Sequence, residues 1–489
     1  MTAVRVLGVD GRELGEPSGE GVARGERVRL EVGPRSSGLS RETTVGLADP
    51  WGRVLWARVL APGARVTIEH RFGGEELGGI YRFFVESRGR RTLLPVAYAG
   101  GAPPESHYRY SFALDVKEPP GAGVRDLSFL LSFPQAAGIA QELEDLRASE
   151  PARIATDLAG NAWLHVDQDF LGTSSRALNF RYDALVRTRS VLWDVAAIRA
   201  GGPGPLPERR AGREFLSPEP GIESDAPAVR DLARGLAGER AEEIAGNAFH
   251  AVRRVLHYRV QEEERGALAG LVAGEGDCTE QAALLAALLR ARGVPARVAL
   301  GRFANSTRLH AIAEVRIRGV WLPMDVTNRP EPLFGTTSNF LVLFRRNWIA
   351  GDRPNSQFSF RCRSARPRAG LAIRDSSRLS RVRGRIRTGE PVPRPAPPGP
   401  VRLGLDLSGT RARIEIESGW SAPLPLWLHL SLGKGALRVI RVWPVTILPG
   451  ARLVRTEEIP ELQRLPVGPG DLRAHLVDAS GRVLAFSST

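Results

Sequence analysis

The strongest constraint on the fold is residues 277–327, where one capped helix is followed by three strand-like stretches. The helix is expected to begin at Cys278, because Asp277 can act as its N-cap and Glu280 can complete a capping box. Strong helix formers fill the run QAALLAALLRA, and Gly293 follows as the stop signal. The segment therefore predicts a short, well-defined helix with a cysteine at its first position.

Cys278 is one of only two cysteines in the 489 residues, and the other is Cys362. At a helix start, backbone N–H groups point outward and the helix dipole is positive, so the thiolate is favoured over the thiol. A lone cysteine on a helix is otherwise most often a small, inert, buried side chain. The flanking Gly-Asp and the strands that follow favour a reactive Cys278.

Three strands are expected after the helix, at 296–303, 310–317 and 320–327. The last two are joined at Arg318-Gly319, which suits a two-residue hairpin turn. With that turn Ile317 faces Val320, and this fixes the register of the whole hairpin.

This register places His310 and Asp325 on one face of the hairpin, because side chains alternate with a period of two. They lie diagonally across the two strands, within reach of a hydrogen bond. Either residue alone would most often be structural. Together with Cys278 at a helix start, they form a nucleophile, base and orienter set.

The residues "GDCTEQAALLAALLRARGVPARVALG…HAIAEVRIRGVWLPMDVT" resemble the catalytic core of the transglutaminase-like superfamily, in particular its bacterial cysteine proteases and acyltransferases. The resemblance assigns Cys278 as nucleophile, His310 as base and Asp325 as orienting acid. The sequence departs from the family pattern at Ile312, where Trp is common, and at Val326, where Pro is common.

The resemblance implies a papain-like α+β core and acyl transfer through a Cys278 thioester, on a protein or peptide substrate. Hydrolysis, glutamine crosslinking and deamidation all remain open. Family members hold the oxyanion with the cysteine N–H and an upstream side chain, often Trp. No Trp lies between positions 194 and 320 here, which leaves Tyr258 and Gln261 as candidates.

The rest of the chain predicts a multidomain α+β protein whose transglutaminase-like core is flanked by β-sandwich, immunoglobulin-like modules. Both ends carry short strands separated by turns, as in such sandwiches. The expected divisions are an N-terminal β-sandwich at 1–120, a β domain at 122–198, the catalytic core at 210–350, an Arg-rich segment at 351–388, a Pro-rich linker at 389–401 and a C-terminal β-sandwich at 402–489.

The formal net charge is +14, and only Lys117 and Lys434 are lysines, so nearly all basic residues are arginine. A GC-rich coding bias is the simplest explanation. Residues 360–389 nevertheless hold ten arginines against one aspartate. This stretch is either a solvated basic edge or a patch for an anionic partner.

No paired CxxC, HExxH or P-loop motif occurs in the sequence, so no cofactor and no metal site is expected. The scarcity of cysteine, the absence of a recognisable signal peptide and the lack of an apolar stretch of spanning length predict a cytoplasmic protein without an integral membrane segment. An alternative function is a catalytically inactive transglutaminase-like scaffold that binds through its β-sandwich modules and basic patch.

Overall fold

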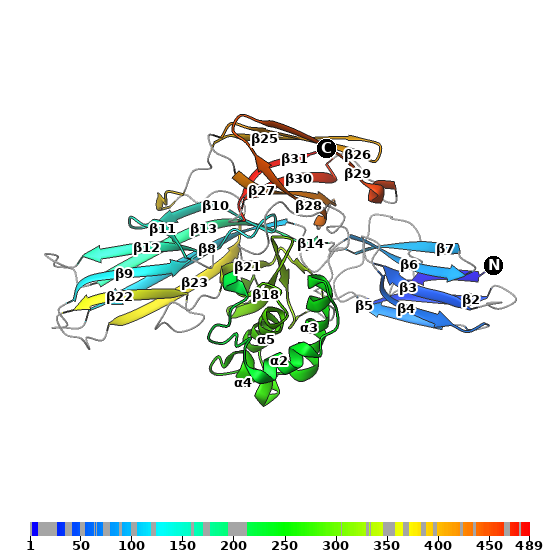
Figure 1. Ribbon diagram of the computed structural model, residues 1–489, viewed down its shortest axis with the longest axis horizontal. Helices are drawn as coiled ribbons and strands as arrows, with labels where there is room; N and C mark the ends of the chain where they lie inside the picture. Colours follow the sequence, from blue (N-terminus) through cyan, green and yellow to red (C-terminus); the bar gives the residue numbers. More distant parts are fainter. Residues whose placement is uncertain are drawn as a thin grey trace. The chain divides into compact units, whose positions relative to one another are not determined.

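The computed structural model consists mainly of strands, and the α-helices among the described residues lie in one stretch of the chain, 227–291 (Figure 1). The chain divides into two compact units, Met1–Glu105 with Gly435–Arg438, and Ser106–Lys434 with Val439–Thr489. The structure describes residues 2–7, 27–34, 42–48, 54–62, 64, 66–71, 79–87, 90–98, 105–118, 124–157, 161–169, 177–193, 213–304, 306–328, 332, 334–345, 357–364, 371–382, 388–394, 399–420, 424–433, 437–463, 470–478 and 481–489.

The first unit contains two antiparallel sheets, ordered β1-β2-β5 and β4-β3-β6-β7. The strands are β1 (Thr2–Leu7), β2 (Arg27–Pro34), β3 (Thr43–Ala48), β4 (Val54–Leu60), β5 (Val66–Arg71), β6 (Gly79–Ser87) and β7 (Arg90–Tyr98). Alternate residues of β2, such as Val28 and Leu30, join Val45 of β3 and Phe83 of β6 in one hydrophobic core. Strands β3 and β4 pair with each other, and the residues that connect them, 49–53, lie outside the described residues.

The second unit begins with two further sheets, ordered β23-β8-β13-β10-β24 and β11-β12-β9-β22. The strands are β8 (Glu105–Lys117), β9 (Val124–Ser132), β10 (Gln141–Ala148), β11 (Arg153–Thr156), β12 (Ala162–Asp169), β13 (Ala177–Arg189), β22 (Phe358–Ser364), β23 (Ala372–Arg381) and β24 (Glu390–Pro391). These sheets thus combine strands from both sides of the helical stretch in the sequence.

This pairing differs from the divisions expected from the sequence. The module expected at 1–120 runs past the first unit, because β8 pairs within the second unit. The Arg-rich segment contributes β22 and β23, and the start of the expected linker contributes β24, whose neighbour Val392 donates its backbone N–H to Leu146 O. The local composition of these segments does not indicate that they pair with strands far away in the sequence.

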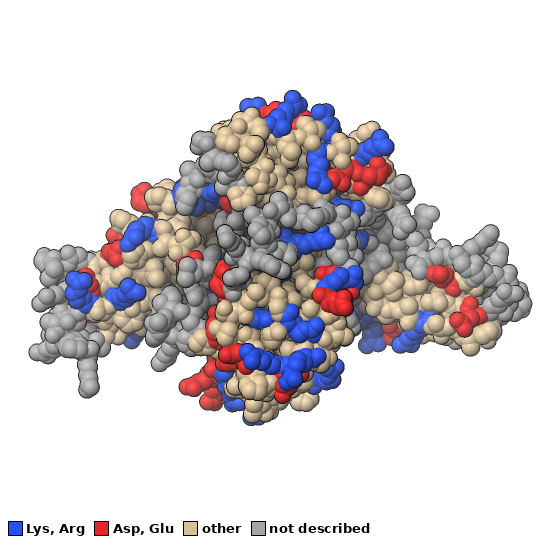
Figure 2. Space-filling model, viewed as in Figure 1, with Lys and Arg blue, Asp and Glu red and all other residues tan. Residues whose placement is uncertain are grey.

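Part of the Arg-rich segment is described. Arg363 of β22 forms an ion pair with Asp126, at 3.4 Å, and Arg374 of β23 lies opposite Asp115 of β8. Arg383, Arg385 and Arg387 lie outside the described residues. On the face drawn in Figure 2, basic and acidic side chains are interspersed.

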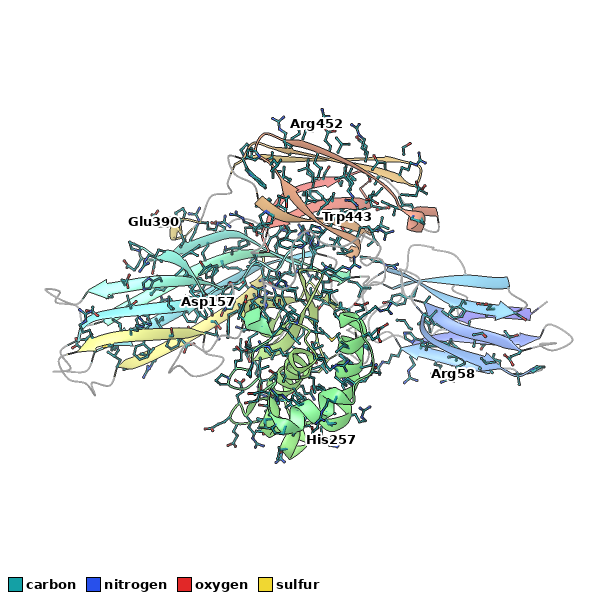
Figure 3. The ribbon with its side chains drawn as sticks, viewed as in Figure 1. Arg58, Asp157, His257, Glu390, Trp443 and Arg452 are labelled. Atoms are coloured by element: carbon teal, nitrogen blue, oxygen red, sulfur yellow. The ribbon has the colours of Figure 1, made fainter. Side chains whose placement is uncertain are left out.

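The C-terminal part of the second unit holds a six-stranded sheet, β20-β14-β28-β27-β30-β31, and a three-stranded sheet, β25-β26-β29. Its elements are β14 (Val191–Trp193), β20 (Gly335–Thr336), β25 (Val401–Ser408), β26 (Arg411–Ser418), β27 (Leu424–Leu432), β28 (Leu437–Ile447), β29 (Arg452–Glu458), the 3-10 helix η2 (Pro460–Gln463), β30 (Leu472–Asp478) and β31 (Val483–Ser488). Trp443 (Figure 3) is 1% exposed in the core that these sheets share.

The helical stretch surrounds one central helix, α5 (Figure 1). Its elements are the 3-10 helix η1 (Arg213–Phe215), α2 (Pro227–Arg234), α3 (Ala241–Val255), the short strand β15 (His257–Tyr258), α4 (Gly266–Ala273), the short strand β16 (Glu275–Gly276) and α5 (Cys278–Ala291). Helices α2, α3 and α4 pack on α5, and every residue from Glu280 to Arg290 is buried. No helix among the described residues is long and apolar enough to cross a membrane.

The C-terminal end of α5 is tied to its neighbours by two arginines. The buried Arg290 donates to Ala296 O, Ser217 O and the Glu219 carboxylate, at 2.8, 2.6 and 3.0 Å. Arg292 donates to the backbone oxygens of Ala233, Leu236 and Gly238 in the connection after α2. These hydrogen bonds join the end of α5 to several different segments, and they therefore fix the direction of the helix axis.

A four-stranded antiparallel sheet, ordered β19-β18-β17-β21, packs on α5. Its strands are β17 (Ala296–Phe303), β18 (Leu309–Ile317), β19 (Val320–Met324) and β21 (Phe340–Arg345). The β18–β19 register confirms the expected hairpin, since Ile317 pairs with Val320. Arg318 and Gly319 both have positive φ, 51° and 83°, as a type I′ turn requires.

Gly301 of β17 pairs with His310 of β18 and has no room for a side chain. A Cβ there would overlap Leu341 O and lie 2.5 Å from the Phe340 ring. We therefore expect Gly301→Ala to destabilise the sheet by about 1–3 kcal/mol, as overpacked cores do. Thermal unfolding monitored by circular dichroism should show a first transition at a lower temperature than in the parent protein.

Gly404→Ala in β25 is the matched control, because its Cβ would meet Glu415 Cβ only at 3.8 Å. This variant should melt like the parent protein. Equal melting temperatures for the two alanine variants would contradict the close packing at Gly301.

Candidate active site

Cys278 lies at the N-terminus of α5, where a complete capping box holds the backbone. Asp277 Oδ1 accepts from Thr279 N at 2.9 Å, and Glu280 Oε2 accepts from Asp277 N at 3.0 Å. Glu280 is fully buried and its other oxygen accepts from Arg265 N at 2.9 Å. The cysteine is partly exposed and is the first residue of the helix, as the sequence predicted.

The short strand β15 lies beside the residues that lead into Cys278. Tyr258 pairs with Gly276 in a parallel bridge, and Arg259 N donates to Gly276 O at 3.1 Å. The Tyr258 side chain is 58% exposed. Its pKa is raised, first by partial burial and then by the negative charges of Cys278 and Asp277, which indicates that the phenol lies near the thiol.

Gln261 also lies near the helix start, but its carboxamide is already engaged. Gln261 Nε2 donates to Arg259 O at 2.8 Å, while its backbone N lies 3.3 Å from Asp277 Oδ2. Of the two side chains considered from the sequence, Gln261 is thus engaged with the backbone, and Tyr258 is the one whose pKa responds to the charge of Cys278.

His310 stands at the start of β18 and is 9% exposed. Its Nε2 lies 2.9 Å from Asp325 Oδ2, so the two residues share the hydrogen bond that the hairpin register predicted. The Cys278 side chain lies close enough to His310 to help raise its pKa. Since Nε2 faces Asp325, Nδ1 is the ring nitrogen left for the sulfur. The rings of Phe303 and Phe340 flank the imidazole, with centroids 5.2 and 5.9 Å away.

The Asp325 carboxylate is held by the turn that follows it. Its Oδ1 accepts from the backbone N–H groups of Thr327 and Asn328, at 3.1 and 3.0 Å. Asn328 Nδ2 donates to Asp325 Oδ2 at 3.1 Å and lies 3.1 Å from His310 Nε2. Asn328 therefore lies at the junction of the histidine and the carboxylate.

The same turn is fastened to two helices. Thr327 Oγ1 donates to Gln281 Oε1 of α5 at 2.8 Å, and Arg253 of α3 donates to Val326 O at 3.0 Å. The helix that carries the thiol and the turn that carries the carboxylate are thus connected independently of the His310 ring. This connection fixes the spacing of the three side chains.

Competing effects set the charge of His310. Burial is the largest effect and lowers the pKa of His310. The interactions with Asp325 and Cys278, and the negative charges of both, raise this pKa and together outweigh burial. The pKa of His310 is raised from 6.5 to about 10. The imidazole is therefore cationic at neutral pH, which makes it the partner that a thiolate nucleophile requires.

The structure brings together all three residues that the sequence singled out, Cys278, His310 and Asp325. Asn328 is not among the residues predicted from the sequence; it directly follows "DVT" and could have been suspected only as a further polar residue at that strand end. Among the described residues, no group of three or more His, Cys, Asp or Glu side chains is placed to hold a metal ion.

Comparison with known families supports the assignment of this region. The model of the transglutaminase-like superfamily matches residues 230–326, a range that contains Cys278, His310 and Asp325. The chain contains a transglutaminase-like domain. This transglutaminase-like domain comprises α3 to α5 and the β17–β19 strands, which are the elements that meet at the thiol. No curated protein matches the chain significantly.

Solved structures with similarity to this chain include two candidate proteases and a transglutaminase. A candidate cysteine protease from Cytophaga hutchinsonii is 15% identical with a TM-score of 0.39, covering 58% of this chain and 95% of that chain. A candidate protease from Parabacteroides distasonis is 13% identical with a TM-score of 0.20, covering 63% of each chain. Red sea bream transglutaminase is 10% identical with a TM-score of 0.18, covering 97% of this chain and 81% of that chain.

The raised pKa of His310 predicts how stability depends on pH. The folded-state value, about 10, lies above the ordinary value of 6.5, so protonation favours the folded state. This contribution is complete below pH 6.5 and is lost as the pH rises through about 10. The melting temperature of the parent should therefore fall between pH 7 and pH 10 more steeply than that of His310→Gln, as measured by scanning calorimetry.

Asp325→Asn should give an intermediate slope, because it removes one of the two partners that raise the pKa of His310. Parallel curves for the parent and His310→Gln over this pH range would show that His310 does not titrate as described.

Proposed function

We propose that this protein catalyses cysteine-dependent acyl transfer, or hydrolysis of an amide or peptide bond, on a protein or peptide substrate. The carrying observation is the 2.9 Å hydrogen bond between His310 and Asp325, together with the effect of the neighbouring Cys278 on the pKa of His310. Cys278 is the nucleophile, His310 the general base and acid, and Asp325 the group that orients the ring.

The reaction follows from the protons that these groups hold. The Cys278 thiolate attacks the carbonyl carbon of the substrate, and the imidazolium of His310 gives its proton to the leaving amine as the C–N bond breaks. The remaining thioester is attacked by water or by a second amine, whose proton returns to His310. The C–S bond then breaks and restores the thiolate and imidazolium.

Stabilisation of the oxyanion requires donors near the sulfur. The backbone N–H of Cys278 is one candidate, because the first residues of a helix have no intrahelical acceptor. The Tyr258 hydroxyl is the second, since the negative charge of Cys278 acts on its pKa and a phenol is protonated, and so a donor, at neutral pH. Tyr258 would thus stand where other family members use Trp.

Selective labelling of the two cysteines tests the nucleophile. Iodoacetamide at pH 6 should alkylate Cys278 at least roughly tenfold faster than Cys362, because an imidazolium partner favours the reactive thiolate. Cys362 is an internal control: it is exposed, and burial together with Asp126 and Glu118 raises the pKa of its thiol. Peptide mass spectrometry would give both rates in one sample.

Asp325→Asn should slow Cys278 labelling at pH 6 and lower turnover by roughly 10²–10⁴-fold with the fold intact. Turnover is followed on casein with a fluorescent amine, measuring amine incorporation, ammonia release and new N-termini, which separates crosslinking, deamidation and hydrolysis. Equal labelling of both cysteines would exclude an activated Cys278 and leave the scaffold function in its place.

The proposed role of Tyr258 gives a separate prediction. Tyr258→Phe keeps the ring and removes only the hydroxyl, so it should lower kcat by about 10²-fold, as loss of one oxyanion donor does elsewhere. Cys278 labelling should remain fast, because labelling forms no oxyanion.

Gln261→Ala is the matched control for this variant, since its carboxamide is bonded to Arg259 O rather than directed at the thiol. It should retain most of the turnover. A larger loss in Gln261→Ala than in Tyr258→Phe would reverse the two assignments.

A further inference from the structure

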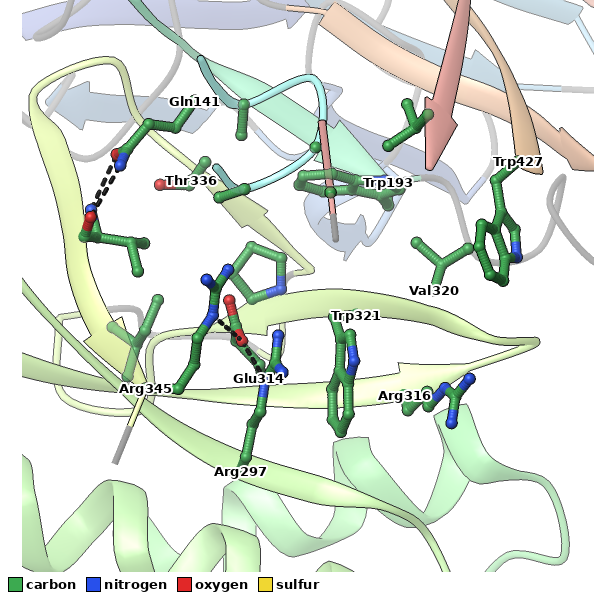
Figure 4. A pocket seen from close by; sticks show the side chains of 18 of the residues that line it. Gln141, Trp193, Arg297, Glu314, Arg316, Val320, Trp321, Thr336, Arg345 and Trp427 are labelled. Carbon is green, nitrogen blue, oxygen red and sulfur yellow. Dashed lines mark hydrogen bonds and ion pairs between the residues drawn. The ribbon is translucent and has the colours of Figure 1, made fainter. Parts of the chain in front are cut away.

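A cavity of about 220 Å³ lies in the second unit, beside the sheet that carries His310 (Figure 4). Ile312 and Glu314 of β18 line it. They lie on the same face of the strand as His310, because alternate residues of a strand share a face. Neither Cys278 nor His310 is among the described residues that line the cavity. It is therefore distinct from the thiol site, and what it binds is independent of whether Cys278 is reactive.

Indole rings from three distant segments line this cavity, which we call the indole pocket. They are Trp193 of β14, Trp321 of β19 and Trp427 of β27 (Figure 4). Trp193 and Trp427 are 5% and 7% exposed. Trp321 is half-buried and neighbours the half-buried Val320 at the hairpin turn, so this end of the pocket faces solvent. Indole rings offer broad, flat apolar surfaces, which suit an aromatic ligand.

The two carboxylates that line the indole pocket, Glu314 and Asp478, are both held by arginines of the protein. Glu314 accepts from Arg297 Nε at 2.6 Å and from Arg345 Nε at 3.3 Å. Asp478 Oδ2 accepts from Arg482 at 3.2 Å. Because these charged groups have partners within the protein, the ligand chemistry is set by the polar atoms of the pocket that have none.

Two buried polar atoms of the indole pocket have no hydrogen-bond partner among the described residues. These are Trp193 Nε1 and His429 Nδ1. His429 is 3% exposed, and burial lowers its pKa to about 4, so its ring is neutral at neutral pH. The indole N–H can only donate, whereas a nitrogen of a neutral imidazole can accept. A buried donor without an acceptor is costly, so Trp193 favours a ligand that brings an oxygen to it.

We propose that the indole pocket binds a small neutral phenol, that is, one aromatic ring that bears a hydroxyl group. The ring packs among the indoles, and the hydroxyl oxygen accepts from Trp193 Nε1. A hydroxyl suits the pocket better than a carbonyl, because it can also donate to a neutral imidazole nitrogen such as His429 Nδ1. An apolar cavity of about 150 Å³ accommodates benzene, so 220 Å³ is enough for a substituted ring.

The binding test uses the full chain and isothermal calorimetry at pH 7, with tryptophan fluorescence as a second readout. The probes are p-cresol, p-xylene, in which a methyl group replaces the hydroxyl, and 4-methylbenzoate, which carries a charge. We expect p-cresol to bind at millimolar concentration or below. It should bind at least roughly tenfold more tightly than 4-methylbenzoate, because an anion loses its hydration in a pocket walled by indoles.

No binding of p-cresol at millimolar concentration, or tighter binding of 4-methylbenzoate than of p-cresol, would overturn the proposal. These comparisons use the parent protein and need no pocket variant. They would also stand if Cys278 proved inert, so this test and that of the proposed function fail independently.

Trp193→Phe tests the position of the hydroxyl, because it removes the N–H and keeps most of the ring. It should weaken p-cresol binding roughly three- to tenfold, the size of one hydrogen bond, and change p-xylene binding by less than about twofold. Trp443→Phe is the matched control: Trp443 is 1% exposed, its Nε1 is also without a described partner, and it does not line the pocket. This variant should bind both probes like the parent. Equal losses for p-cresol and p-xylene in Trp193→Phe would refute the hydrogen bond to the hydroxyl and with it the proposal.

Discussion

The capping box at the start of α5 is the interaction on which the site depends. Asp277 and Glu280 hold the backbone on either side of Cys278, and Glu280 does so from a fully buried position. A carboxylate buried there is tolerated because backbone N–H groups from two segments satisfy it. The thiol is consequently presented by a rigid helix rather than by a loop, which suits a nucleophile whose partner must lie at hydrogen-bond distance.

The sheet supplies that partner with equal rigidity. On β18, Ala311 and Ala313 are buried on one face of the sheet, and His310 stands on the other face with Glu314 further along the strand. Gly301 opposite His310 lets β21 approach closely, so that Phe340 can flank the imidazole. The apolar surroundings lower the pKa of His310, whereas Asp325 and Cys278 raise it, and the net result is a raised pKa.

The local features of this site could be predicted from the sequence, and the long-range ones could not. The helix start follows from Asp277 and Glu280, and the His310–Asp325 pairing follows from a two-residue turn at Arg318-Gly319. Both depend on neighbours within about fifteen positions. Trp193 and Trp427 line one cavity from distant parts of the sequence, and β8 pairs with β23 across about half of the chain, so neither arrangement leaves a periodic signal. Asn328 had a local position but no pattern that distinguished it from an ordinary turn residue.

The β18–β19 hairpin also constrains how the chain can change in length. A single residue inserted in β18 between His310 and the turn would move His310 to the opposite face of the sheet, away from Asp325. Lengthening both strands by one residue at the Arg318-Gly319 turn would instead leave the existing pairs intact. The number of residues between His310 and Asp325 can therefore change only by an even number if both side chains are to stay on one face. Selection at this hairpin thus acts on whether that number is odd or even, rather than on its size.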